Sequence, residues 1–288
     1  MWVLYAFLSA FFAGIMAILA KIGIRDMDSN LATAIRTLVV VVLSWGIVFL
    51  FPAEQTLATI DSKSLLFLVL SGLATGASWL CYFKALQLGS VNQVTPVDKS
   101  SVLLTMILSF LFLGEPLSLL KVLALFSIGI GTYLMIDFKS DEADTKKNQQ
   151  ASWFIYASFS AFFASLTAIL GKIGIENVPS NLGTAIRTLV ILGIAWVIVF
   201  AQKKHRDLPL IAKRNWYYLF LSGLATGLSW LCYYRALQDG PASVVVPIDK
   251  LSIVLTIFFS YFILGEKLRK KAWLGLILLV GGTLLLLV

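Results

Sequence analysis

The sequence contains one stretch twice. Residues 71–87 read SGLATGASWLCYFKALQ, and residues 222–238 read SGLATGLSWLCYYRALQ, a shift of 151 positions. The same shift aligns nearly all of the remaining chain, from Trp2 with Trp153 to the C-terminus, without an insertion. Internal repetition of this kind decides the architecture of a fold. We therefore analyse the chain as two copies of one unit, and we call two residues 151 positions apart twins.

The composition excludes a water-soluble domain. Of the 288 residues, 59% are hydrophobic and 13% are charged, and the mean hydropathy is +0.90. A soluble domain is about half apolar and about a quarter charged, so we expect an integral membrane protein. Many of the residues behind the net charge of +8 lie in short loops between apolar runs. That pattern is typical of loops that face anionic lipid, and it does not favour nucleic-acid binding.

Each copy holds five apolar runs close to the roughly 20 residues that a membrane-spanning helix needs. The predicted spans are Val3–Ile24, Leu31–Phe51, Ser64–Leu86, Val94–Leu113, Leu117–Ile136, Trp153–Ile175, Leu182–Ala201, Trp216–Leu237, Ser243–Leu264 and Ala272–Leu287. We predict an all-α membrane protein with ten transmembrane helices in two five-helix repeats. The first repeat covers 1–137, a loosely ordered polar linker covers 138–152, and the second repeat covers 153–288.

An odd number of spans per copy requires the second copy to enter the membrane from the opposite side. The loop charges agree, because the loop over 52–63 holds one basic residue and its twin over 202–215 holds five. Basic loops are usually cytoplasmic, so we expect the basic side to be cytoplasmic and both termini to lie outside. The predicted location is the inner cell membrane, which the chain crosses many times.

Ionisable twins inside the predicted spans are the strongest indication of a site, because charges in a bilayer are costly and usually paired or functional. These pairs are Lys21/Lys172, Arg36/Arg187, Lys84/Arg235, Asp98/Asp249 and Lys99/Lys250. The alternative is that these cations have no role in a site and extend from the helix ends to the lipid headgroups. We favour this alternative for Lys84 and Arg235. The other four pairs keep their residue type on opposite faces of the membrane, which a topology signal does not require. We therefore expect the arginines and the Asp-Lys pairs in a shared interior, whereas Lys21 and Lys172 fit either interpretation.

Aromatic twins extend this candidate interior. Trp79 and Tyr82 share one helix face at i, i+3 spacing, and Trp230 and Tyr233 repeat the pair. An aromatic belt at the membrane surface is the alternative. The predicted substrate-binding residues are Arg36, Arg187, Trp79, Trp230, Tyr82, Tyr233, Lys21, Lys172, Lys99 and Lys250.

Asp98 and Asp249 allow two interpretations. Either carboxylate could couple transport to a proton or another ion, or it could cap a helix and pair with a cation such as Arg36. Pro96 and Pro247 stand two residues before these aspartates and are expected to fix where their helices begin. The doubled spacing of Gly72 and Gly76 in the repeated stretch is a close-packing motif of membrane helices.

These features resemble the EamA-type transporters of the drug/metabolite transporter superfamily. Each repeat has a fourth helix that ends in Leu-Gly-Glu, at 113–115 and 264–266, and a glycine-rich fifth helix. The resemblance covers essentially the whole chain. It implies ten helices in an inverted repeat, with helices 5 and 10 outside a central cavity, and structural roles for Glu115 and Glu266. Family members often have a proline nearer the middle of helix 4, and both termini are often drawn in the cytoplasm.

We therefore predict a secondary transporter, an exporter or exchanger, for a small polar metabolite with a carboxylate or other anionic group, working by alternating access. The alternative is an integral membrane enzyme or a lipid-handling protein. The spans hold no histidine and no closely spaced carboxylate pair, which disfavours an enzyme. His205 stands alone, and Cys81 and Cys232 lack a metal-binding spacing, so no cofactor or metal is predicted. The expected partners are the small-molecule substrate and membrane lipids, for a monomer or homodimer.

Overall fold

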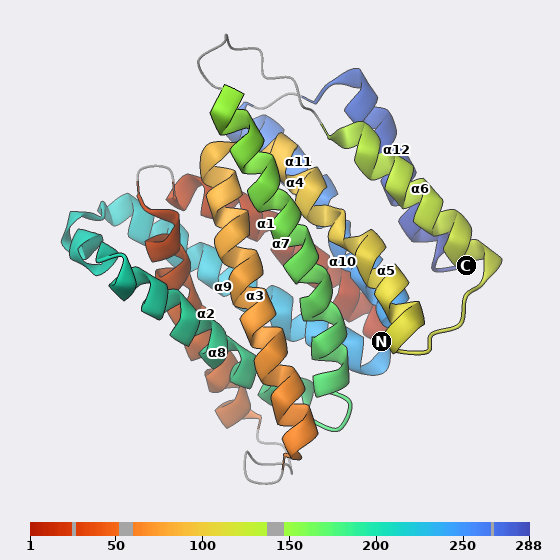
Figure 1. Cartoon of the computed structure of the whole chain (residues 1–288), viewed down its shortest axis with the longest axis horizontal. Helices are drawn as coiled ribbons and strands as arrows, with labels where there is room; N and C mark the ends of the chain where they lie inside the picture. The colour runs from red at the N-terminus through yellow and green to blue at the C-terminus, as the bar shows by residue number, and fades with distance from the viewer. Residues whose placement is uncertain (25–26, 52–59, 137–146, 266–267) are drawn as a thin grey trace.

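A computed structural model of the chain describes residues 1–24, 27–51, 60–136, 147–265 and 268–288, and within these ranges the only regular elements are helices (Figure 1). They are α1 (Trp2–Gly23), α2 (Ser29–Leu50), α3 (Ser62–Leu88), α4 (Val91–Lys99), α5 (Ser101–Phe112), α6 (Leu119–Met135), α7 (Lys147–Gly174), α8 (Ser180–Ala201), the 3-10 helix η2 (Lys204–Leu210), α9 (Lys213–Asp239), α10 (Ala242–Lys250), α11 (Ser252–Phe259), the π-helix η3 (Ser260–Leu264) and α12 (Lys270–Leu285).

Every apolar run in the sequence is helical, and most of them are long enough to cross a bilayer. Within the described ranges, seven helical stretches meet this condition, counting α4 with α5 and α10 with α11 as continuous stretches, and α6 is apolar but shorter at 17 residues. The chain is therefore a multi-pass integral membrane protein. The predicted linker differs in part, because α7 already begins at Lys147, whereas residues 137–146 lie outside the described residues.

The prediction that the two prolines fix the helix starts is wrong. α4 begins at Val91, and Pro96 lies inside it. α10 likewise begins at Ala242, before Pro247. The interruption comes after the Asp-Lys pair instead, at Ser100 in the first repeat, where one backbone N–H is shared between two carbonyl oxygens. Each Asp-Lys pair thus ends a short helix rather than beginning a long one.

The two repeats run in opposite directions. α3 and α7 are antiparallel, because Gly89 after the end of α3 lies against Trp153 near the start of α7, and Gly174 at the end of α7 lies against Leu68 near the start of α3. α1 points the same way as α3, since Lys21 near its end reaches a backbone carbonyl near the end of α3. The first helices of the two repeats, α1 and α7, are therefore opposed. We call the end of the bundle where α1 and α3 finish end A, and the opposite end is end B.

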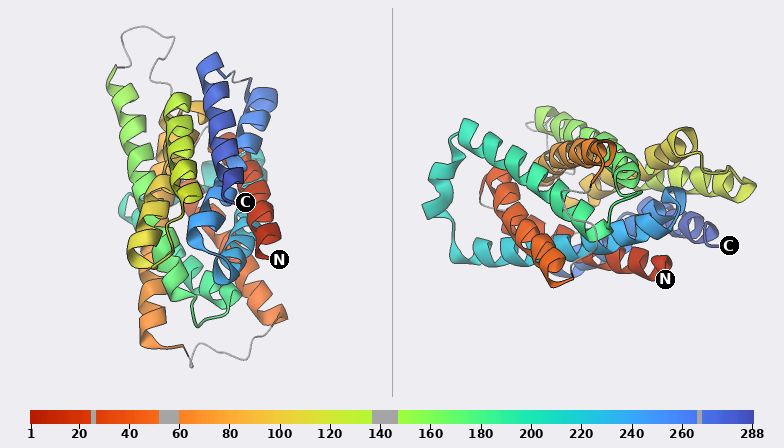
Figure 2. Two further views of the ribbon diagram at one scale, coloured as in Figure 1. Left: turned by 90° about the vertical axis from the view of Figure 1, so that its right-hand side faces the viewer. Right: turned by 90° about the horizontal axis from the view of Figure 1, so that it is seen from below.

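The helices pair by their positions in the repeats, as expected for a pseudo-two-fold axis. α1 packs along α9, and α7 packs along α3, so the first helix of each repeat lies within the other repeat. α2 contacts α8 on one flank, and α6 contacts α12 on the other, as the views in Figure 2 also show. The fifth helices, α6 and α12, thus stand outside the central group of helices.

The glycines of the repeated stretch allow the close approach that joins the repeats. A Cβ added to Gly72 of α3 would lie 2.8 Å from the Cβ of Val190 on α8, and one added to Gly223 of α9 would lie 2.7 Å from the Cβ of Val39 on α2. Side chains essentially never pack this closely, so glycine is needed at both places. The packing motif predicted from the sequence thus lies at an interface between repeats.

The Leu-Gly-Glu turn after α5 also joins the repeats. Gly114 adopts a left-handed backbone conformation, with φ of 64°, which glycine adopts without strain. The turn carries Glu115 to the start of α10, where its carboxylate accepts hydrogen bonds from the backbone N–H groups of Ala242 (2.6 Å) and Ser243 (3.0 Å). A carboxylate at a helix N-terminus satisfies free N–H groups and the helix dipole. Glu115 therefore has the structural role that the resemblance implied, and Glu266 lies outside the described residues.

Candidate functional site

A cavity of about 100 Å³ lies between the two repeats. Its wall follows the pseudo-symmetry, because all but two of its lining residues form twin pairs. The pairs are Ala13/Ala164, Met16/Thr167, Thr75/Thr226, Ser78/Ser229, Trp79/Trp230, Tyr82/Tyr233, Asp98/Asp249 and Lys99/Lys250, and the unpaired residues are Ala17 and Phe83. The two repeats thus contribute almost the same residues to one site on the axis between them.

Each aspartate of this wall is held by a serine from the other repeat. Ser160 of α7 donates a hydrogen bond to Oδ1 of Asp98 at 2.7 Å, and its Oγ lies 3.2 Å from the Oγ of Ser78. In the second half, Ser9 of α1 donates to Oδ1 of Asp249 at 2.6 Å. A buried carboxylate needs such donors, and here the donors belong to the opposite repeat. Any movement of the repeats against each other therefore changes the surroundings of both carboxylates.

The two lysines beside the aspartates make the site close to neutral in charge. Nζ of Lys250 lies 4.0 Å from Oδ2 of Asp249. Lys99 lies within electrostatic range of Lys250 and of both aspartates. Two carboxylates and two ammonium groups therefore share one small cavity. Such a site can offer a hydrogen-bond acceptor to a cationic group and a donor to an anionic group.

The aromatic twins predicted from the sequence also meet in this cavity. The rings of Trp79 and Trp230 are in edge-to-face contact across the axis, with centroids 5.7 Å apart and an interplanar angle of 74°. Tyr82 and Tyr233 are both buried in the same wall. The aromatic side chains therefore face the interior of the bundle, and the alternative of an aromatic belt does not describe them.

Arg36 and Arg187 lie behind the cavity wall rather than in it. Both side chains are 1% exposed. Arg36 of α2 donates from Nε to Ser222 (2.9 Å) and from Nη2 to Thr226 (2.7 Å) on α9, and its Cζ lies 4.2 Å from the ring centre of Phe83. Among the described residues no carboxylate pairs with Arg36, so the predicted pair with Asp98 is not formed.

Arg187 repeats this arrangement in the opposite half. From α8 it donates to the hydroxyls of Ser71 (2.9 Å) and Thr75 (2.6 Å) on α3, and its Cζ lies 4.0 Å from the ring centre of Tyr234. The Ser and Thr acceptors are in the repeated stretch, on either side of the close-packed glycines. Each arginine therefore joins the second helix of one repeat to the third helix of the other. Substrate contact by Arg36 or Arg187 remains a prediction.

Lys21 and Lys172 are placed farther from the cavity, at helix ends. Nζ of Lys21 donates to the carbonyl oxygen of Gly89 at 2.8 Å, and Nζ of Lys172 donates to that of Gly240 at 2.9 Å. Both lysines also bond a carbonyl in the last turn of the same helix, α3 or α9. Cations are favourable at helix C-termini because they complement the dipole and the free carbonyl groups. Both lysines therefore act as caps here, and neither lines the cavity.

The serines and threonines that hold the charged residues were not predicted from the sequence. Ser9 and Ser160 bind the aspartates, and the hydroxyl residues of the repeated stretch bind the arginines. All of them are twins inside predicted spans, so the doubling itself was an available signal. Small hydroxyl residues are common in membrane helices, and for this reason charge alone appeared to be the better guide.

The fold and the cavity define a class: a multi-pass membrane protein in which two oppositely directed repeats enclose one polar cavity. The model of the EamA-like transporter family matches residues 1–137 and 151–288. The match covers nearly the whole chain, and the chain belongs to this family.

Two similar proteins agree with this assignment, and one solved structure agrees with the fold. An uncharacterized transporter from Sinorhizobium sp. is 47% identical over 135 residues, which are 47% of this chain and 96% of that protein. An uncharacterized transporter from Synechocystis sp. is 25% identical over 213 residues, 70% of this chain and 59% of that protein. A crystal structure with a TM-score of 0.74 and 14% identity covers 99% of this chain and 96% of the solved chain, and it supports the fold alone.

Proposed function

We propose that the protein is a secondary transporter that moves a small polar metabolite with a carboxylate group through the cavity between the repeats. The observation that carries this proposal is the pair of Asp-Lys sequences on one pseudo-two-fold axis, each aspartate bonded to the opposite repeat. Charged groups at the interface of inverted repeats are typical of transporter sites. A rocking movement of the repeats would expose the same groups first at one end and then at the other.

The charges of the cavity support a zwitterionic substrate, with an ammonium as well as a carboxylate. The sequence indicates a cation-rich interior, but four of its cations are occupied elsewhere: the two arginines by hydroxyl groups, and Lys21 and Lys172 by helix-end carbonyls. Two aspartates and two lysines remain. A simple anion would leave both carboxylates without a new partner, whereas a zwitterion can pair with groups of both kinds.

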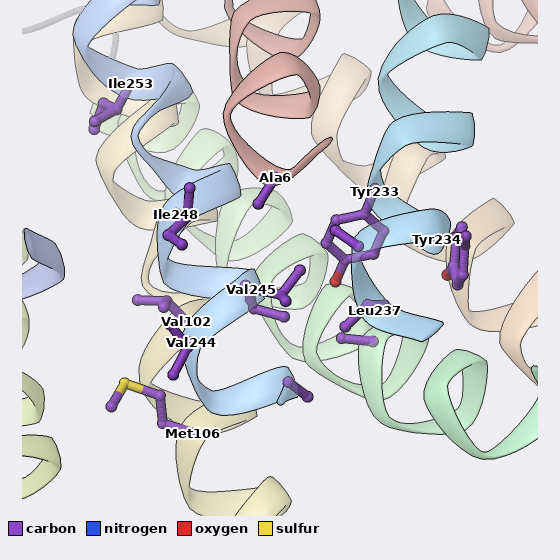
Figure 3. Packing of buried hydrophobic residues seen from close by; sticks show 14 of the residues in the cluster. Ala6, Val102, Met106, Tyr233, Tyr234, Leu237, Val244, Val245, Ile248 and Ile253 are labelled. Atoms are coloured by element: carbon purple, nitrogen blue, oxygen red, sulfur yellow. The ribbon is translucent and has the colours of Figure 1, made fainter. Parts of the chain in front are cut away.

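The packing supports a conformation that is closed at end B. All residues of α10 from Ala242 to Asp249 are buried, and Val244 and Ile248 lie with Val102 and Met106 of α5 in one apolar cluster (Figure 3). The corresponding helix at end A, α4, has the half-buried Asn92 and Gln93 in its first turn. An apolar seal at one end only is the asymmetry that alternating access requires. Release of this seal is the proposed second state.

For the membrane orientation we keep the assignment from loop charge. Ten helical spans would cross the inner cell membrane, with end A in the cytoplasm and both termini outside. The basic residues of the described segments after α8 and before α12, such as Lys203, Lys204 and Arg269, are at end A. This position supports the assignment. Labelling of a single cysteine, either inserted directly after Met1 or substituted for Lys204, tests it in intact cells. Reaction of the first but not the second with an impermeant reagent is expected, and the reverse pattern contradicts it.

Asp98 and Asp249 are the proposed coupling groups. Each accepts a hydrogen bond from a serine hydroxyl in the closed arrangement, and each faces a lysine in the same cavity. A carboxylate whose partners change between conformations can take up a proton in one of them. Coupling to a proton or another ion, in export or exchange, is therefore part of the proposal.

Reconstituted protein tests the function directly. Proteoliposomes preloaded with serine would be given labelled glycine, serine, leucine, malate or choline at the outside. We expect saturable uptake of the zwitterions. The double variant Asp98→Asn/Asp249→Asn should abolish it, while Lys84→Ala, at a half-buried lysine outside the cavity, should leave it intact. Absence of saturable flux for every zwitterion contradicts the proposal. Preference for malate would retain a transporter but reject the zwitterionic substrate.

A further inference from the structure

The cavity is nearly symmetric, so the few places where its two halves differ are informative. Of the eight twin pairs in its wall, seven consist of identical residues, and only Met16/Thr167 changes chemistry. A perfectly two-fold site would bind a substrate equally well in two opposite orientations. The differing residues therefore decide which way round an asymmetric substrate lies.

The differences all make the same side of the cavity apolar. Ala17 and Phe83 line the cavity, but their twins Ala168 and Tyr234 do not. Ala17 follows Met16 on α1, and Phe83 belongs to the apolar cluster against which Met16 packs. Met16, Ala17 and Phe83 all line the cavity, and we call these three residues the apolar subsite.

The residues around the apolar subsite hold it in place. Ser222 donates to the backbone carbonyl of Met16 and accepts from Nε of Arg36, whose guanidinium lies over Phe83. This chain of contacts runs from the subsite to the interface between α2 and α9. The subsite is therefore built into the packing of the bundle rather than carried on a loop.

The opposite side has a hydroxyl group in place of the methionine. Thr167 takes the place of Met16, and its Oγ1 accepts a hydrogen bond from Oγ1 of Thr75 at 3.2 Å. Thr75 and its twin Thr226 both line the cavity, so Thr167 is the residue that makes this side more polar. Tyr234 takes the place of Phe83 but is stacked behind Trp230, with ring centroids 5.3 Å apart and an interplanar angle of 25°. Tyr234 therefore does not line the cavity, whereas Phe83 does. Among the described residues, this side of the wall has no counterpart of Met16 and Phe83.

We propose that Met16, Ala17 and Phe83 form a specificity subsite that receives the apolar substituent of the substrate, while the polar side chain of Thr167 at the twin position of Met16 disfavours the reversed orientation. The proposal rests on the proposed transport of a zwitterion, whose charged groups would lie at the Asp-Lys pairs on the axis. The subsite follows the rule that an apolar pocket discriminates between substituents by fit.

The test is the ratio of transport efficiencies for leucine and serine, two zwitterions that differ in the substituent. In proteoliposomes, Met16→Thr is expected to lower the leucine-to-serine ratio by about 10-fold or more, in the range that a change in an apolar pocket produces. The matched twin variant Thr167→Met should not lower it. Phe83→Tyr should lower the ratio as well, whereas Tyr234→Phe, which makes the opposite change outside the cavity wall, should leave it unchanged.

The leucine-to-serine ratio tests the subsite separately from the proposed transport function. If Met16→Thr and Phe83→Tyr change leucine and serine transport by the same factor, or if Thr167→Met lowers the ratio as much as Met16→Thr, the subsite is rejected and the transporter stands. If the unmodified protein carries neither leucine nor serine, the proposed zwitterion transport fails first and the subsite fails with it. For a variant that no longer transports, the rise in melting temperature with each probe gives the same comparison, because a ligand stabilises the folded state that binds it.

Discussion

α4 and α10 are twin helices that begin at opposite ends of the bundle. Both are nine residues long, carry a proline at the sixth position and end in Asp-Lys, and both aspartates accept from a serine of the other repeat. In the first turn α4 has Asn92 and Gln93, where α10 has Ser243 and Val244. The Asp-Lys residues that line the cavity are therefore identical in the two helices, whereas the first turn, at the end of the bundle, differs. The comparison indicates that the proposed site requires symmetry, and that the proposed gating requires a difference between the two ends.

The largest expected effect comes from the part that the two helices share. Asp98→Asn and Asp249→Asn each remove a charge that the proposed mechanism needs, so we expect each to reduce the transport rate in proteoliposomes by roughly 100-fold or more, as for loss of a positioned acid or base. Ser160→Ala and Ser9→Ala remove only a hydrogen-bond donor and should reduce it less. Full activity of either asparagine variant would mean that the two helices are not equivalent.

The arginines behind the wall provide the next test, which separates packing from substrate binding. Arg187→Ala removes two hydrogen bonds from a charged donor, each worth about 1.5–3 kcal/mol, so the melting temperature of the detergent-solubilised protein should fall markedly. Arg36→Ala should cost somewhat less, because Arg187 also contacts the rings of Trp230 and Tyr234. Arg187→Lys should not restore stability, since an ammonium lacks the planar fork of donors.

A loss of transport without a loss of stability would indicate that the arginines bind the substrate. If Arg36→Ala and Arg187→Ala leave the melting temperature unchanged and abolish uptake, their main role is in transport, as the sequence predicts. If both stability and uptake fall together, the melting temperature measured with and without leucine decides the matter. A ligand-induced rise that persists in the variant means that the arginine is not needed for binding.

An exchange of residues in the first turn tests the difference between α4 and α10. Val244→Gln buries an amide in the seal at end B, at a cost of about 1–3 kcal/mol if it finds no partner, and should shift the protein towards opening at this end. With Cys81 and Cys232 replaced by serine, a cysteine at Met106 should then react several-fold faster with a water-soluble maleimide. Gln93→Val is the matched change at end A and should leave that rate unchanged or lower.

The sequence was sufficient for the fold because the fold depends on apolar runs and on repetition. The apolar runs, the odd number per copy and the glycine spacing all express short-range or periodic properties. The helices confirm an all-α fold, and the Gly72 contact confirms the close packing, whereas ten membrane spans remain a prediction. The helix starts near Pro96 and Pro247 could not be predicted in this way. A proline is tolerated inside a helix when neighbouring groups compensate for the missing N–H, and those neighbours come from distant parts of the chain.

The candidate site was predictable in its members but not in their roles. Doubling identified Asp98, Lys99, Trp79 and their twins, all of which line the cavity. It identified Arg36 equally well, although its hydrogen-bond partners, 186 and 190 residues away, hold it behind the wall. A charged residue within an apolar run gives the same signal in the sequence whether it binds a ligand or joins two helices. Only the position of the partner distinguishes the two roles.

The smallest expected effect concerns how the two short helices are capped. Ser90 caps α4 locally in a capping box with Gln93, whereas α10 follows Pro241, which makes no side-chain cap, and receives the carboxylate of Glu115 from the first repeat. Ser90→Ala should cost about 0.5–1 kcal/mol, and Glu115→Ala slightly more, because a charged cap serves two N–H groups. Glu115→Gln keeps an acceptor, so its melting temperature should lie between those of the unmodified protein and Glu115→Ala.

Glu115 also joins α5 to α10 at the sealed end. Its removal should therefore raise the rate of maleimide labelling at Met106→Cys, which Ser90→Ala should not do. Equal labelling in both variants would mean that the seal depends on its apolar side chains alone.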